Sequence, residues 1–296
     1  PPRSTQSRSS AASDVYKRQV GKSTLLNYFL GTKLSITSRK AQTTRYQLLG
    51  IHTTPKAQYI FVDTPGYQLK HLNTLNKNLN KTVKHALQDV DVILFLIEPR
   101  QMTEVDEKIL QMIPKETPII LVINKVDCLK DKTKLLELIQ VFKENDRYKE
   151  IIPTSVKKKN NLKELLESTL EFLPEQEFIY EEDQITDKNE RFLAAEIVRE
   201  KIFRLTGQEL PYSIAVEIEK FEHEGNVRRI FAAIIVERDS HKPMIIGNKG
   251  IRLKEISTSA RIDMEKLFGG KVWLETWVKV QKGWSDDLRA LKSLGL

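Results

Sequence analysis

The sequence predicts an α/β domain with a mostly parallel sheet, followed by a smaller α+β domain. Segments 59–62, 92–97 and 119–123 are continuous apolar runs of strand length, separated by helix-sized segments. Such runs are typical of strands buried on both faces, and their alternation with helices is typical of right-handed βαβ units. After residue 190 the order of elements changes, and strands with alternating apolar residues appear. The 296 residues are enough for two such domains.

Composition and charge indicate which class of partner the protein binds and in which cellular compartment it works. The net charge of +8 and the isoelectric point of about 9.3 indicate an anionic partner, nucleic acid first and a membrane surface second. Cys128 is the one cysteine, which excludes a disulfide framework and favours a reducing compartment. No apolar run reaches the ~18 residues of a membrane span, and the first residues lack an apolar signal segment. We therefore expect a cytoplasmic protein.

The segment Val-Gly-Lys-Ser-Thr-Leu-Leu at 20–26 is typical of the second half of a phosphate-binding loop. Gly21 lets the backbone pass close to a phosphate, Lys22 supplies an ammonium to its oxygens, and the Ser23 hydroxyl suits Mg²⁺. The apolar residues that follow predict a helix whose N-terminal N–H groups point at the anion. The predicted phosphate site comprises Val20, Gly21, Lys22, Ser23 and Thr24.

Residues 1–19 carry no strand pattern. They are rich in Ser and Arg and nearly free of aliphatic residues, a composition typical of disorder, whereas a phosphate-binding loop must follow a buried strand. Tyr16 also stands where the pattern G-x-x-x-x-G-K-[ST] requires glycine. Two interpretations stay open: a genuine divergent terminus, or foreign sequence that replaced the first strand and half of the loop. We favour the second, because the sequence from Val20 onward is internally consistent.

Two further polar segments predict ligands for Mg²⁺ and a γ-phosphate. Segment 38–45 has neither a helical nor a strand period, which predicts a loop in which Thr43 or Thr44 reaches Mg²⁺ when a γ-phosphate is present. The strand at 59–62 ends in Asp63-Thr64-Pro65-Gly66. Asp63 is expected to hold Mg²⁺ through water. Gly66 is expected to offer its N–H to the γ-phosphate, since only glycine lets the backbone come so close.

The strand at 119–123 ends in Asn124-Lys125-Val126-Asp127, which predicts the base site. Asp127 can accept two hydrogen bonds from N1 and N2 of guanine, a pair of donors that adenine lacks, so it would select GTP over ATP. Asn124 and Lys125 are expected to brace the loop and stack on the base. Segment 151–155 predicts a short strand and turn, where a backbone N–H near Ser155 and Val156 could meet guanine O6.

Each of these motifs alone also occurs as an ordinary turn, solvated loop or helix cap. In an open α/β sheet, however, ligands bind at the carboxyl ends of the strands, and every motif follows a strand in the expected order. That coincidence predicts a guanine-nucleotide site, which binds GTP and GDP with Mg²⁺. Helices are expected at about 72–87, 104–113, 132–142 and 161–172.

The later part of the chain predicts an RNA-binding domain. The expected order is α-β-β-α-α-β: a helix at 192–205, strands at 213–221 and 227–236, two helices on either side of a glycine loop, the second over about 253–267, and a strand at 272–280. A loop Gly-Asn-Lys-Gly at 247–250 precedes the second long helix, and glycine at both ends would let a nucleic-acid backbone approach. From residue 240 onward, 11 Lys and Arg stand against 6 Asp and Glu. The predicted RNA-binding residues are Ile246, Gly247, Asn248, Lys249, Gly250, Arg252 and Lys254.

Three tryptophans of this domain have two possible roles. Trp273, Trp277 and Trp284 could stack on RNA bases, or they could pack within the domain. Because tryptophans that alternate along a strand are at least as often packing residues, packing is favoured.

The ordered motifs resemble the translation-factor-related GTPases. The wording Ser-Arg-Lys-Ala-Gln-Thr-Thr-Arg at 38–45 and the C-terminal segment 271–294 resemble the Era family of bacterial ribosome-assembly GTPases. The resemblance begins at residue 20 and implies a P-loop GTPase domain followed by a type II KH domain. It implies that the catalytic residues are Lys22, Thr44, Asp63 and Gly66. It also implies binding of 16S ribosomal RNA, maturation of the small ribosomal subunit and contact with the inner face of the cell membrane.

The chain departs from the family pattern at three places, Tyr16, Gln19 and segment 154–156, whereas Tyr67 departs only from the Ras-like enzymes. Besides Tyr16, Gln19 stands where the family has an Asn linked to monovalent-cation binding, which bears on a K⁺ requirement. Tyr67 follows Gly66, where Ras-like enzymes carry a water-orienting Gln. The Thr154-Ser155-Val156 segment differs mildly from the family's Ser-Ala ending.

The predicted organisation is a GTPase domain at 1–174, a linker at 175–190 and a KH domain at 191–296, in a monomeric protein. Two alternatives stay open. One is an RNA-binding protein whose GTPase domain is a nucleotide-defective scaffold. The other is a different ribosome- or tRNA-associated GTPase that carries a KH module.

Overall fold

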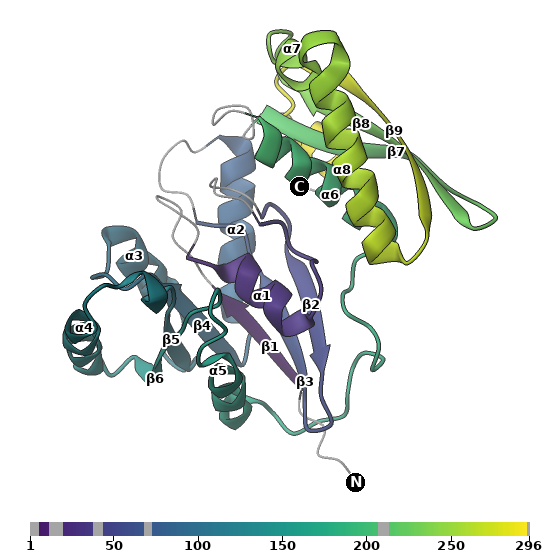
Figure 1. Cartoon of the computed structure of the whole chain (residues 1–296). Coiled ribbons are helices and arrows are strands. Elements are labelled where there is room, and N and C mark those ends of the chain that lie inside the picture. Colours follow the sequence, from purple (N-terminus) through teal and green to yellow (C-terminus); the bar gives the residue numbers. More distant parts are fainter. Residues whose placement is uncertain (1–5, 12–19, 38–43, 68–72, 207–212, 295–296) are drawn as a thin grey trace. The chain divides into compact units, whose positions relative to one another are not determined.

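The computed structural model describes residues 6–11, 20–37, 44–67, 73–206 and 213–294 (Figure 1). The chain divides into two compact units. The first comprises Pro1–Ser35, Thr44–His71 and Leu79–Asp187, and the second comprises Ile36–Thr43, Leu72–Asn78 and Lys188–Leu296. The expected boundaries at residues 174 and 190 stay a prediction.

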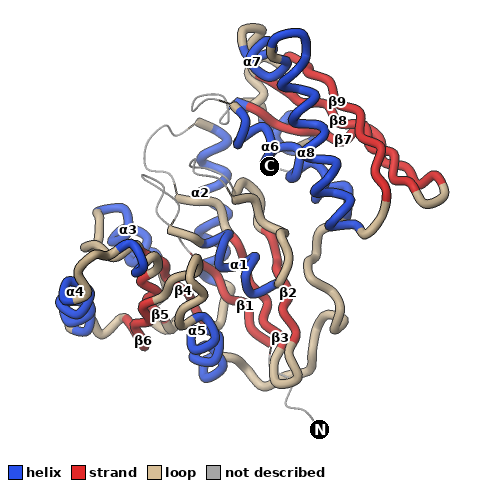
Figure 2. Tube along the Cα trace, in the orientation of Figure 1, coloured by secondary structure: helices blue, strands red, loops and turns tan. Residues whose placement is uncertain are grey.

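The first unit contains a six-stranded sheet of order β2-β3-β1-β4-β5-β6, in which only the β2–β3 pair is antiparallel (Figure 2). The strands are β1 Gln6–Ala11, β2 Leu48–Thr53, β3 Gln58–Asp63, β4 Val92–Ile97, β5 Ile119–Ile123 and β6 Tyr148–Pro153. The side chains of β3, β4 and β5 are buried throughout, as their continuous apolar runs predict. Edge strand β2 is absent from the sequence-based prediction, because its residues mix apolar, glycine and polar types.

Strand β1 corrects the expectation that residues 1–19 contain no strand. It lies between β3 and β4 and pairs in parallel with both. The backbone N–H and C=O groups of two buried strands need partners, and any extended segment can supply them. Since a ladder uses backbone groups alone, a serine-rich segment is able to take this central position. Tyr16 and Gln19 lie outside the described residues.

Five helices lie between or directly after these strands: α1 Lys22–Leu30, α2 Thr74–Gln88, α3 Glu104–Met112, α4 Thr133–Lys143 and α5 Leu162–Thr169. The part of α2 up to Asn78 belongs to the second unit and the rest to the first. The four helices expected from periodicity are confirmed, with ends shifted by at most three residues; a 3₁₀ turn, Leu170–Phe172, extends α5. Helix α3 begins at a capping box, in which Asp106 N–H donates to Thr103 and Asp106 accepts from Thr103 N–H. Residues of α2, α3 and α4 share one apolar core with β4 and β5.

The acidic segment after α5 packs against the sheet instead of forming an unattached spacer. The Gln58 side chain donates to the Tyr180 carbonyl at 2.8 Å and accepts from the N–H groups of Ile179 and Tyr180. Ile51 N–H donates to the Ile185 carbonyl at 2.9 Å. The Ile51 bond satisfies a backbone N–H on the edge of β2, and the Gln58 bonds satisfy backbone groups of the acidic segment itself, a position that composition alone cannot predict.

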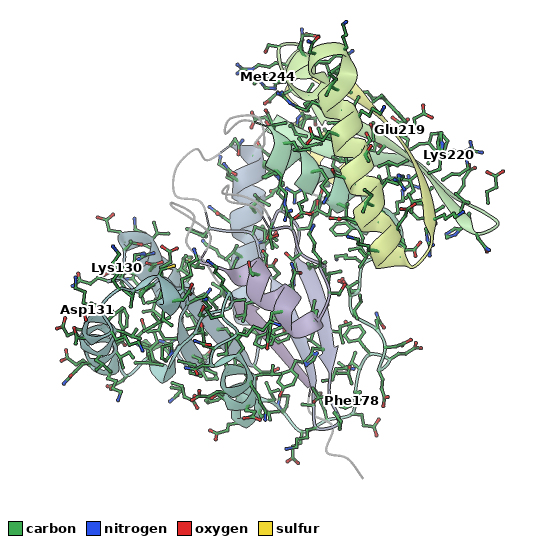
Figure 3. All side chains as sticks on the ribbon, in the orientation of Figure 1. Lys130, Asp131, Phe178, Glu219, Lys220 and Met244 are labelled. Carbon is green, nitrogen blue, oxygen red and sulfur yellow. The ribbon has the colours of Figure 1, made fainter. Side chains whose placement is uncertain are left out.

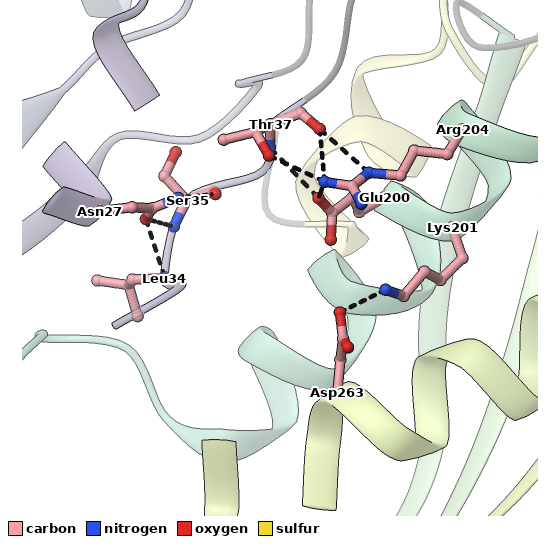
Figure 4. A network of polar contacts seen from close by, with 8 residues as sticks. All are labelled: Asn27, Leu34, Ser35, Thr37, Glu200, Lys201, Arg204 and Asp263. Carbon is pink, nitrogen blue, oxygen red and sulfur yellow. Dashed lines mark hydrogen bonds and ion pairs between the residues drawn. The ribbon is translucent and has the colours of Figure 1, made fainter. Parts of the chain in front are cut away.

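The second unit has the expected order of elements, with one short helix added at the end. It contains α6 Glu190–Leu205, β7 Ile214–Glu224, β8 Val227–Val236, α7 His241–Ile246, α8 Ile251–Phe268, β9 Lys271–Val280 and α9 Leu288–Ser293. Strand β8 lies in the centre, antiparallel to β7 and parallel to β9. Alternate residues of all three strands pack with α6 and α8 in one core, and Lys201 of α6 pairs with Asp263 of α8 (Figure 4).

Candidate guanine-nucleotide site and RNA-binding loop

Lys22, Asp63 and Thr44 meet where α1 begins and β3 ends. Lys22 Nζ donates a hydrogen bond to the Thr64 carbonyl at 2.6 Å and lies 3.9 Å from Asp63 Oδ1. Thr44 Oγ1 donates to Asp63 Oδ2 at 3.2 Å. Burial lowers the pKa of Lys22, while the negative charge of Asp63 opposes that shift. Four predicted site residues from three separate segments of the chain therefore lie close together.

Ser35 and Asn27 extend this network, although sequence analysis did not identify them. Figure 4 shows the contacts of Asn27 with Leu34 and Ser35. Ser35 Oγ donates to Asp63 Oδ2 at 2.6 Å, and the Ser35 side chain is almost fully buried. Asn27 Oδ1 accepts from the N–H groups of Leu34 and Ser35, and Asn27 Nδ2 donates to the Ser35 carbonyl at 2.8 Å. The one sequence signal was an Asn on the helix that follows Gly-Lys-Ser, which is too common to be specific.

Asn124 joins the phosphate loop to the base loop. Its Nδ2 donates to the Val20 carbonyl at 2.7 Å, and its Oδ1 accepts from Val156 N–H at 3.2 Å. Gly21 has φ +105°, and a Cβ there would lie 2.3 Å from Asn124 Nδ2, so glycine is required on both grounds. The expected bracing role of Asn124 thus has a defined geometry, within a side chain that is 2% exposed.

Asp127 is exposed at the end of β5, within the 3₁₀ turn Val126–Cys128, and Ser155 orients it. Ser155 Oγ donates to Asp127 Oδ1 at 2.5 Å, and the same hydroxyl accepts from Lys158 N–H at 3.1 Å. Lys125 has φ +66° and pairs with Glu98 at 2.6 Å. The carboxylate is therefore held in place while it stays accessible to a ligand.

The side chains near Lys22 fit a magnesium ion. Within the described residues, no three His, Cys, Asp or Glu side chains group as metal ligands. The available donors are the hydroxyls of Ser23 and Thr44 and the Asp63 carboxylate, which are hard oxygen ligands of the kind that suits Mg²⁺. Thr43, the other candidate, lies outside the described residues. Gly66 and Pro65 follow directly after β3.

The glycine loop of the second unit has a backbone shape that needs its glycines. Gly247 has φ +71° and ψ −178°, and a Cβ there would lie 2.7 Å from the Arg252 Cβ. Gly250 has φ +78° and caps α8, and a Cβ there would meet no atom within 4 Å. Lys249 also has a positive φ, of 48°. The loop is a tight turn, and glycine at both of its ends leaves its backbone free of Cβ atoms there.

The side chains around this loop are mostly exposed. Lys249, Arg252 and Lys254 are exposed, and Arg252 Nη1 donates to the Met244 carbonyl at 2.6 Å, which closes the loop. Met244, which is labelled in Figure 3, is 42% exposed, and Ile251 is 66% exposed. Apolar and cationic groups thus line one surface, as contact with both bases and phosphates requires.

Trp284 and Trp273 differ in how far they are exposed. Trp284 is fully buried and donates from its indole N–H to the Ser213 carbonyl at 3.3 Å, so its role is packing. Trp273 is 41% exposed, and the Arg229 guanidinium lies over its ring at 5.0 Å. A stacking role for Trp273 stays a prediction.

Family models match both halves of the chain. Residues 17–125 match the model described as 50S ribosome-binding GTPase, and residues 209–285 match the KH domain model. The GTPase Era of Chromobacterium violaceum is 51% identical over 282 residues, which cover 95% of each chain. The GTPase Era of Nitrosomonas eutropha is 51% identical over 281 residues, again 95% of each chain.

Two solved structures are similar over almost the full length. One is a variant of Aquifex aeolicus Era bound to GDP.AlF4⁻, with a TM-score of 0.92, 42% identity and 99% of each chain covered. The other is Era in complex with MgGDPNP and nucleotides 1506–1542 of 16S ribosomal RNA, with a TM-score of 0.93, 41% identity, and 100% of this chain and 99% of that chain covered. The protein therefore belongs to the Era family of GTPases.

Proposed function

We propose that the protein binds GTP, hydrolyses it to GDP and binds 16S ribosomal RNA through its KH domain. The observation that supports the nucleotide site most directly is the bridge made by Asn124. Its two hydrogen bonds tie Val20, in the phosphate loop, to Val156, in the base loop, at the carboxyl edge of one sheet. A phosphate site and a base site held by one side chain suit a nucleoside triphosphate.

Asp127 supplies the choice of base. With Ser155 bonded to Oδ1, the carboxylate is oriented to accept from N1 and N2 of guanine. Adenine offers no such pair of donors and would leave the carboxylate without its partners. The chain should therefore prefer GTP to ATP.

Ser23, Thr44 and Asp63 are the residues that would hold Mg²⁺, which supplies charge compensation for the phosphates when bound. Lys22 would neutralise β- and γ-phosphate oxygens, and the Gly66 N–H would donate to the γ-phosphate. Tyr67 is half-buried and packs against the apolar core shared by α2, α3 and β4. Because a tyrosine cannot orient water as the Gln of Ras-like enzymes does, we expect slow intrinsic hydrolysis.

The RNA target rests on the similar Era structure that holds nucleotides 1506–1542 of 16S ribosomal RNA. The exposed, positively charged loop with its required Gly247 supports the same role in this chain. The proposed assistance in maturation of the small ribosomal subunit rests on membership of the Era family.

Three finer features are also proposed: peripheral contact with the inner face of the cell membrane, stimulation by K⁺, and a monomeric state. None of the helices that the structure describes combines the length and apolar character that crossing a bilayer requires. Stimulation by K⁺ predicts faster GTP turnover in potassium buffer than in sodium buffer.

A second candidate function is an RNA-binding protein with a nucleotide-defective GTPase domain. The observation that favours it is Tyr16, at the position where the phosphate-loop pattern requires glycine. It predicts RNA binding that does not respond to GTP.

The deciding experiment measures GTP and ATP binding, with Mg²⁺, to two proteins. One is the chain as it stands, and the other carries an apolar first strand and Gly in place of Tyr16. If both bind GTP and neither binds ATP, the proposed function holds for this chain. If only the second protein binds GTP, the scaffold function is correct. Binding of ATP as tight as GTP would overturn the role of Asp127.

A further inference from the structure

Helix α2 carries a row of lysines that neither the nucleotide site nor the glycine loop uses. Lys77, Lys81 and Lys84 are exposed and follow the i, i+4, i+7 spacing that places residues on one helix face. With a rise of 1.5 Å per residue, this α2 lysine face extends over about 10.5 Å. Exposed His85 and Gln88 adjoin it.

Helix α2 differs in charge from the other long helices that the structure describes. Helix α2 has no Asp or Glu in its 15 residues, whereas α4, α6 and α8 all contain acidic residues. Elsewhere, helical cations pair with a carboxylate one turn away: Lys163 with Glu167, Arg204 with Glu200, and Arg261 with Glu265. Within the described residues, no carboxylate lies within ion-pair distance of the α2 lysines.

The row of lysines lowers the stability of helix α2 when no ligand is bound. Like charges one turn apart, as at Lys77 and Lys81, repel each other and destabilise a helix, while a carboxylate at either position would stabilise it. An anionic ligand would remove that repulsion. The ligand cannot use the helix N-terminus, because Asp286 Oδ1 accepts from Thr74 N–H at 3.1 Å and the Ser285 carbonyl from Leu75 N–H at 3.2 Å.

We propose that the α2 lysine face binds the phosphate backbone of an RNA segment, in addition to the segment held by the glycine loop. Three regularly spaced ammonium groups with no carboxylate among them complement a polyphosphate chain. A lipid surface is disfavoured, since a membrane-binding helix needs exposed apolar residues, whereas the apolar residues of α2 (Leu75, Leu79, Val83 and Leu87) are buried. The inference rests on the proposed RNA binding.

The test uses the full chain and two RNA probes: the 16S rRNA fragment 1506–1542, and a single-stranded oligonucleotide from it just long enough for the loop, which clamps about four nucleotides. The test variant is K77Q/K81Q/K84Q. The control, K134Q/K143Q/K149Q, removes the same charge from three other exposed lysines.

For the long fragment, the test variant should lower the slope of log affinity against log salt by about 2, and lower affinity about tenfold or more at low salt. The short probe should bind the test variant and the wild type with equal affinity. The variant K77R/K81R/K84R should restore the wild-type salt slope for the long fragment. Equal salt slopes for the test and control variants would overturn the inference. The proposed function would still hold in that case, provided that the wild-type protein binds the RNA. Loss of binding to phosphatidylserine vesicles, with RNA binding unchanged, would assign the face to lipid. Failure of the wild type to bind either RNA would overturn both proposals.

Discussion

The nucleotide site and the glycine loop are built in opposite ways. The first joins buried side chains from distant parts of the chain, such as Asn124 with Val20 and Asp63 with Ser35. The second uses neighbours in sequence, with Arg252 bonded to Met244, and its side chains are exposed. A substitution in the first site should therefore disturb fold and ligand binding together. One in the second should change binding and leave the fold intact.

The largest expected effect is a change of base preference in Asp127→Asn. An amide still accepts from Ser155, but it places an N–H donor toward the donors of guanine. We expect GTP affinity to fall about a hundredfold to a thousandfold, and affinity for xanthosine triphosphate to rise, because xanthine has a carbonyl at C2. The control is Asp131→Asn, which changes the same charge at an exposed position where Asp131 accepts from Thr133. Equal GTP affinity in both variants would contradict the role of Asp127.

Asn124→Ala tests whether stability and ligand binding are linked in the nucleotide site. The change leaves the buried Val20 carbonyl and Val156 N–H without this partner, so the free energy of unfolding should fall by about 3 kcal/mol, with weaker GTP binding. Urea denaturation and nucleotide titration measure the two quantities. The control, Asn145→Ala, removes an exposed acceptor of Arg147 N–H and should cost about 0.5 kcal/mol. A variant with normal stability and weak GTP binding would contradict the link.

Gly250→Asp makes the opposite test in the glycine loop. Gly250 has φ +78° with open space around it, and Asp and Asn both tolerate that backbone better than other residues. Gly250→Asn therefore matches the strain without adding charge. We expect RNA affinity to be about tenfold weaker in the Asp variant than in the Asn variant, with a gap that narrows as salt rises. Wild-type affinity in the Asp variant would rule out a KH-type RNA contact at this loop.

The same contrast explains what the sequence alone could predict. Motifs at strand ends have fixed places in an α/β sheet, so Lys22, Asp63 and Asp127 could be assigned to one edge in advance. Ser35 and Asn27 could not, because their part in the site depends on tertiary contacts with Asp63 and the following loop. Strand β1 was also missed, since its place depends on the backbone groups of β3 and β4 and not on its own residues.

His52 makes the stability of the first unit depend on pH. It lies on β2, half-buried, with its ring 6.0 Å from that of Tyr59, and burial lowers its pKa below 6.5. Between the lowered pKa and 6.5 the unfolded chain binds more protons, so the free energy of unfolding rises with pH across this window and falls on acidification. His52→Gln should flatten that part of the pH profile of the first unit's Tm, whereas exposed His85→Gln should leave it unchanged. If the pH profile of His52→Gln equals that of the wild type, the half-buried imidazole contributes nothing to the loss of stability on acidification. Another group would then cause that loss.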